Sequence, residues 1–72
     1  MVIMGRDSDA KPYKVGEVIR DGLGVKFDVP ERLADMLQGL EFEGKLLDPQ
    51  SPDFFKILPQ VLRGDRLWAV PE

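Results

Sequence analysis

Residues 25–40 read VKFDVPERLADMLQGL, and this stretch decides the fold. It opens with Val25, Phe27 and Val29 alternating with Lys26 and Asp28, which is the period-two pattern of a strand with one buried face. Apolar side chains then recur at helical spacing, at Val29, Leu33, Met36, Leu37 and Leu40. A strand followed directly by an amphipathic helix predicts an α+β domain.

The start of this helix carries recognisable signals. Asp28 can cap it, Pro30 suits the first turn because its missing N–H would have no partner there, and Glu31 completes an Asp-x-x-Glu box. Gly39 and Gly44 mark its end. The pattern predicts a helix over residues 29–40 with a purely structural role for the two acidic residues at its start.

The rest of the chain predicts a small sheet and one or two further helices. Residues 2–4 favour an edge strand, residues 15–23 a short third helix interrupted by Gly16 and Gly22, and residues 40–47 a hairpin. Ser51 and Pro52 favour the start of a helix over residues 52–62, and residues 66–70 a last strand that is apolar on both faces. We expect a single α+β domain over residues 1–72, with two or three short amphipathic helices on a small antiparallel sheet. Residues 1–12 and 71–72 are the segments expected to fray.

The composition argues against catalysis. The chain of 72 residues has no His and no Cys, which removes most routes to general-base and covalent chemistry and the usual soft metal ligands. We therefore expect neither enzyme activity, nor a cofactor, nor a metal site. A minor alternative is a carboxylate-dependent metal protein or enzyme that uses Asp7, Asp9 or Asp21. No motif points to a known family.

The net charge of the chain argues against nucleic acid as a partner. The net charge is −3, and Lys and Arg form no basic stripe, so nucleic acid is an unexpected partner. Residues 1–4 are apolar, but Arg6 and Asp7 follow at once, so the chain has neither a signal peptide pattern nor a membrane span. We expect a cytoplasmic protein.

The second predicted helix offers an unusually wide apolar surface. Its apolar side chains spread over roughly 160°, against about 100° on the first helix. Phe54 and Phe55 are adjacent and diverge, so one of the two rings is expected to face outward. Pro59 should kink or break the helix. Two interpretations stay open: the wide surface is the centre of the core, or it binds a partner.

A binding role is the leading functional hypothesis. We expect a small regulatory protein, an adaptor or an inhibitor such as a phage or bacterial modulator, that occludes or clamps a larger protein. The candidate contact residues are the apolar positions of the second helix together with two arginines and the sole tryptophan: Phe54, Phe55, Ile57, Leu58, Arg63, Arg66 and Trp68. The alternative is a homo-oligomeric structural protein in which the same surface meets its own copy.

Overall fold

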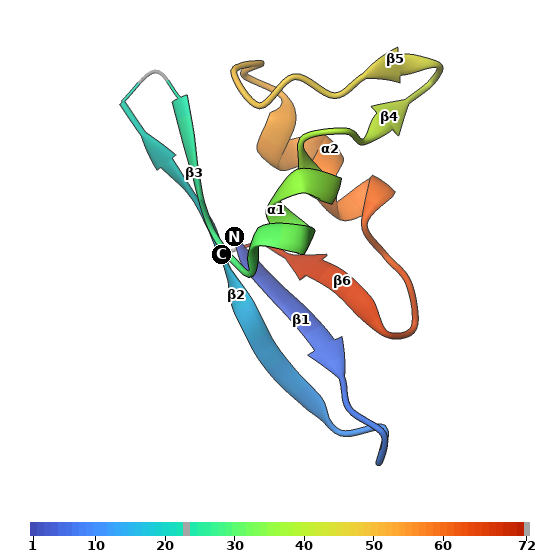
Figure 1. The fold of residues 1–72 in the computed structure, drawn as a ribbon. Helices are drawn as coiled ribbons and strands as arrows, with labels where there is room; N and C mark the ends of the chain where they lie inside the picture. The colour runs from blue at the N-terminus through green and yellow to red at the C-terminus, as the bar shows by residue number, and fades with distance from the viewer. Residues whose placement is uncertain (23, 72) are drawn as a thin grey trace.

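A four-stranded antiparallel sheet is the centre of the domain (Figure 1). The computed structural model describes residues 1–22 and 24–71. Three consecutive strands form a meander, and the last strand of the chain returns to lie beside the first, giving the order β3-β2-β1-β6. The strands are β1 (Val2–Arg6), β2 (Pro12–Asp21), β3 (Gly24–Asp28) and β6 (Leu67–Val70).

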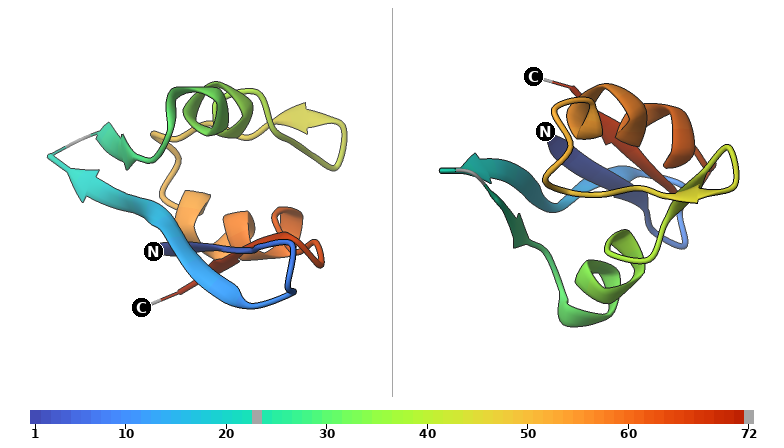
Figure 2. Two further views of the ribbon diagram at one scale, coloured as in Figure 1. Left: turned by 60° about the horizontal axis from the view of Figure 1, so that its bottom comes forward. Right: turned by 90° about the horizontal axis from the view of Figure 1, so that it is seen from above.

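Two helices and a small hairpin lie between β3 and β6 in the chain. They are α1 (Glu31–Leu37), the hairpin strands β4 (Glu41–Phe42) and β5 (Lys45–Leu46), and α2 (Phe54–Val61). Figure 2, left, shows both helices on one side of the sheet, with no described element on the other. Within the described part of the chain, neither helix has the length and apolar character needed to cross a membrane. The expected α+β class, with two helices and an antiparallel sheet, is confirmed.

The core lies between the helices and the sheet face that they cover. Ile3, Val18 and Ala69 enter it from the sheet, Leu37 from α1, and Phe54 and Leu58 from α2. The ring of Phe54 meets Phe27 of β3 edge to face, with centroids 6.3 Å apart. Because these residues come from β1, β2, β3, β6 and both helices, one cluster holds the whole domain together.

The predicted third helix at residues 15–23 is wrong, because this segment belongs to β2. Leu23 lies outside the described residues. Gly16 pairs with Ile3 next to a β-bulge, and a Cβ added to it would come within 2.2 Å of the Asp28 carbonyl oxygen. Gly16 therefore allows β2 to approach the end of β3 closely, and it does not interrupt a helix. The apolar side chains of residues 15–19 have a spacing that also fits a twisted strand. The segment forms a strand because it can pair with β1 on one side and with β3 on the other.

The N-terminal strand is also placed differently from the prediction. Residues 2–6 form β1, which pairs with both β2 and β6 and so lies inside the sheet rather than at its edge. The segment expected to fray thus has hydrogen-bonded neighbours on both sides. Glu72, at the other end expected to fray, lies outside the described residues.

The two helices begin later than predicted. Asp28 ends β3 and caps nothing, since Pro30 holds the N-cap position of α1 without a side-chain cap, and α1 ends at Leu37 rather than at residue 40. Before α2, the Ser51 hydroxyl accepts a hydrogen bond from the Asp53 N–H at 3.3 Å, so Ser51 shapes the turn that leads into the helix. Pro59 does not break α2, which continues to Val61.

Local interactions shape two turns of the chain. The β4–β5 hairpin predicted at residues 40–47 is present, and its turn residues Glu43 and Gly44 both have positive φ, 54° and 80°, as a two-residue type I′ hairpin turn requires. In the turn between β1 and β2, the Asp7 carboxylate accepts hydrogen bonds from the N–H groups of Asp9 and Lys11, at 2.9 and 3.0 Å.

The two edges of the sheet differ. Outside β6, the chain after α2 supplies partners: the Gly64 N–H donates to the Leu67 carbonyl at 2.8 Å, and the Ala69 N–H donates to the Leu62 carbonyl at 2.9 Å. The other edge is β3, a strand of five residues with the exposed Lys26 at its middle. A short edge strand with a central lysine is a common protection against pairing with other chains.

Candidate functional site

The structure separates the seven predicted contact residues into three places. Phe54 and Leu58 lie in the core and have no exposed surface. Neither can contact a partner while the domain keeps this fold, so the expectation that these two residues lie on the binding surface needs correction. The physical reason is that α2 is the central helix of the core, which was the other interpretation of its wide apolar surface.

Phe55 and Ile57 flank the core at the two sides of α2. The half-buried Phe55 ring meets Phe54 edge to face, with centroids 5.5 Å apart, and the Arg20 guanidinium lies 4.8 Å above its centroid. Ile57 lines a hollow of about 300 Å³ with Phe42 and Leu46 of the small hairpin. The wide apolar surface of α2 is therefore largely covered by the domain's own residues.

Arg63, Arg66 and Trp68 belong to a different region, the side of the sheet that no helix covers. Residues paired across antiparallel strands point to the same side of a sheet. Trp68 pairs with Met4 of β1, Met4 pairs with Lys14 of β2, and Arg63 forms a bridge with Trp68. These four residues therefore form one row across the sheet, with two cations at its ends and two large apolar side chains between them.

A second row lies beside the first. Val2 of β1 pairs with Val70 of β6 on one side and with Glu17 of β2 on the other. We call the first row the Met4 row and the second the Val2 row, and together with Arg6 they make up the open face. Its residues are Val2, Met4, Arg6, Lys14, Glu17, Arg63, Trp68 and Val70, and the pairs of Glu17 with Asp28 and of Ile19 with Lys26 continue the same side of the sheet onto β3.

The apolar residues of the open face take no part in the core. Ile3 and Ala69, which point to the covered side, are 0% and 8% exposed, whereas Val70 on the open face is 39% exposed. Val2, Met4 and Trp68 are half-buried by their neighbours in the sheet and do not pack against the core cluster. Val2, Met4, Trp68 and Val70 thus lie on the open face without a covering layer among the described residues, and Ile19 of β2, which is 37% exposed, lies on the same side.

Charged groups frame these apolar residues. The Arg6 guanidinium lies 4.9 Å above the centroid of the Trp68 ring and donates hydrogen bonds to the carbonyls of Asp65 and Ala10, at 3.0 and 3.1 Å. Arg66 sits at the same end, where its carbonyl accepts from the Arg6 N–H at 3.2 Å. Arg6 is therefore held in place over the indole rather than free to move.

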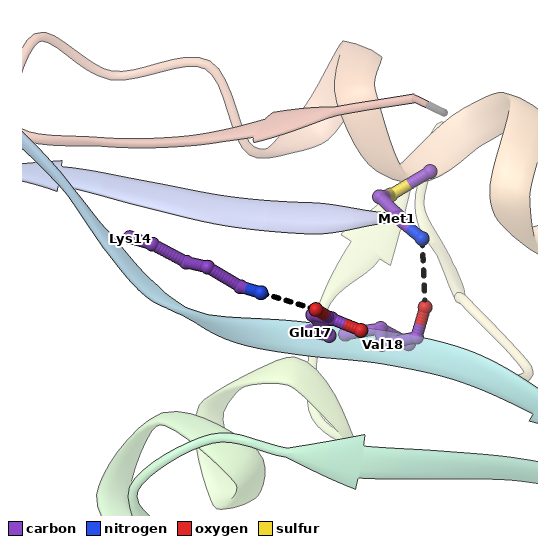
Figure 3. A network of polar contacts seen from close by, with 4 residues as sticks. All are labelled: Met1, Lys14, Glu17 and Val18. Atoms are coloured by element: carbon purple, nitrogen blue, oxygen red, sulfur yellow. Dashed lines mark hydrogen bonds and ion pairs between the residues drawn. The ribbon is translucent and has the colours of Figure 1, made fainter.

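Lys14 and Glu17 join the two rows. The bulge in β2 puts both on the open face, where the Lys14 ammonium donates to a Glu17 carboxylate oxygen (Figure 3). This hydrogen bond, together with the positive charge of Lys14, lowers the pKa of the Glu17 carboxyl below its usual value. Glu17 is thus ionised at neutral pH, and the open face carries opposite charges in adjacent rows.

Of the carboxylates considered for metal chemistry, Asp7 and Asp9 share one turn and Asp21 lies apart from them. The Asp7 carboxylate binds backbone N–H groups of its own turn, and Asp21 ends β2 at the far side of the sheet from that turn. Within the described part of the chain, no three side chains of the metal-binding types gather at one place.

Sequence analysis found Trp68 and Arg63 but missed Val2, Met4 and Val70. A signal for them was present, since residues 67–70 and residues 2–4 are apolar at successive positions and therefore on both sides of their strands. With helices on one side only, such strands leave apolar side chains bare on the other. Which side is bare follows from the pairing register, which the sequence does not state.

No protein-family model matches this chain, and no curated protein or solved structure matches it either.

Proposed function

We propose that this domain is a small non-catalytic protein-binding module that acts through the open face of its sheet. The observation that supports this most is the one-sided arrangement of the fold. Both helices cover the same face, and apolar side chains lie on the other, namely Val2, Met4, Ile19, Trp68 and Val70.

The chemistry of the open face suits a protein partner. Trp and Arg are the residues most enriched at energetically important interface positions, and here Arg6 is stacked on Trp68 at 4.9 Å before any partner arrives. A side chain that is already ordered loses little entropy on binding. An apolar centre with a charged rim is also the usual anatomy of a protein interface.

The proposed mode of action is occlusion or clamping. The open face of a sheet in a domain of 72 residues can cover a surface of a larger protein or hold it in one conformation. Occlusion and clamping are the modes of action of regulatory adaptors and inhibitors, which is the class of protein we propose here.

Affinity capture with matched variants tests the proposal. Met4→Lys puts a charge at the centre of the open face, and Leu46→Lys puts the same charge on β5, where Leu46 is 64% exposed and remote from the sheet. We expect proteins, including copies of this chain, to be retained by the wild type and by Leu46→Lys but lost with Met4→Lys. Retention that is equal for all three would contradict a role for the open face.

A further inference from the structure

We infer that the partner of the open face is a second copy of this chain, packed sheet against sheet around a two-fold axis. This inference rests on the proposed function, because it names the occupant of the same surface. The argument comes from the order of charges and apolar groups in the two rows of the open face.

The two rows are complementary to each other. The Met4 row places Lys14, Met4 and Trp68 on β2, β1 and β6, and the Val2 row places Glu17, Val2 and Val70 on the same three strands. At each strand, a group of one row faces its natural partner in the other: cation against carboxylate, thioether against isopropyl, indole against isopropyl.

A two-fold axis that runs between the rows, across the strands, exchanges them. In that arrangement Lys14 meets the partner's Glu17, Met4 meets the partner's Val2, and Trp68 meets the partner's Val70. The strands of the two sheets then run nearly antiparallel, which is the aligned packing found in two-layer sandwiches. A two-fold contact requires such self-complementarity, since every contact occurs twice.

The charges gain from this pairing. In one copy Lys14 already contacts Glu17. In the pair, the two ammonium groups and the two carboxylates alternate around the axis, so each charge has opposite charges beside it. A two-fold axis along β1 would keep the rows and exchange β2 with β6 instead, so that Lys14 would face the partner's Trp68 and Glu17 the partner's Val70. Both charges would then be covered by apolar groups without an opposite charge, which is unfavourable.

The area of the sheet sets the strength of the association. Four strands about 4.8 Å apart and a longest strand of ten residues limit the footprint to about 600 Å² for each copy, less than the roughly 800 Å² of a standard interface. We therefore expect a reversible dimer with a dissociation constant in the micromolar range, on the order of 1 to 100 μM.

Analytical ultracentrifugation of the purified chain, from roughly 1 μM to 1 mM to span that range, tests the inference. The wild type should change from monomer to dimer with rising concentration, and Leu46→Lys should behave in the same way. Met4→Lys and Val70→Lys should each associate at least tenfold more weakly while circular dichroism shows an unchanged fold; two sites keep the test valid if one variant does not fold.

Charge exchange tests the symmetry. Lys14→Glu and Glu17→Lys should each weaken association, and the double variant should restore it, because the rows are again complementary. A wild type that stays monomeric throughout, or a dimer that Met4→Lys and Val70→Lys leave intact, would overturn the inference.

The same experiments distinguish a failure of the dimer inference from a failure of the proposed protein-binding function. A monomeric chain that still retains a foreign protein in a Met4-dependent way rejects the second copy and keeps the binding role of the open face. A monomeric chain with no Met4-dependent partner rejects both.

Discussion

The two sides of the central sheet are built from the same four strands, yet they are organised differently. On the covered side, Ile3, Val18 and Ala69 interlock with both helices and are at most 8% exposed. On the open side, apolar residues lie next to one another in each row with charged residues at the row ends, and Val70 keeps 39% of its surface exposed. The difference teaches that both helices cover one side of the sheet and leave the apolar side chains of the other side without a covering layer among the described residues.

The largest expected effect comes from the covered side. Phe54→Ala removes a ring with no exposed surface, and a buried Phe→Ala change costs about 3–5 kcal/mol, as much as a domain of this size has in total. We expect the variant to be largely unfolded at 25 °C by circular dichroism and urea titration. A folded variant that has lost only its binding partners would reverse the assignment of the two sides.

A smaller loss is expected at the glycine of the bulge. Gly16→Ala adds a methyl group where the Asp28 carbonyl oxygen would be 2.2 Å away, so β2 or the start of the α1 segment must shift. Overpacking of this kind costs about 1–3 kcal/mol. Urea denaturation measures it, and Gly22→Ser, in a turn with open space around it, shows the separate effect of positive φ.

On the open side we expect almost no effect on folding. Val70→Lys should change the free energy of unfolding by less than about 0.5 kcal/mol, as surface substitutions do, when measured at a concentration low enough for the monomer. A loss above about 2 kcal/mol would show that this side is packed within the single domain, and the comparison between the two sides would fail.

The smallest effect concerns pH. Because the pKa of Glu17 is lower in the folded chain than its usual 4.5, its carboxylate stabilises the fold above that pH, and the contribution is lost as the pH falls. The wild type should therefore exceed Glu17→Gln slightly in melting temperature at pH 7, and the difference should shrink as the pH falls below 4.5. Equal melting temperatures at both pH values would mean that the contact with Lys14 adds nothing to stability, as is common for exposed pairs.

The sequence was sufficient for local features with strong chemistry of their own. The alternation at residues 25–29 gave β3, and the glycine and charged residues around position 44 gave the β4–β5 hairpin. Both depend on interactions between near neighbours in the chain, and such interactions are visible in the order of residues.

The sequence was insufficient where contacts between segments far apart in the chain determine the secondary structure or the burial of a residue. Residues 15–19 have apolar spacing that fits a helix or a strand, and only pairing with β1 and β3 selects the strand. Phe54 and Phe55 look alike in sequence, and the position of Phe27 against Phe54 determines which ring is enclosed. The open face is the extreme case, since its rows combine residues from positions 2 to 70.

The edges of the sheet limit what association can produce. The chain after α2 occupies the outer edge of β6, and two copies of β3 paired around their centre would oppose Lys26 to Lys26. Growth of the sheet strand by strand is thereby discouraged. When two molecules associate through the open face, the open faces of both are buried and no second open face is left to bind a third copy. The product should therefore be a closed dimer that does not polymerise into filaments even at high concentration.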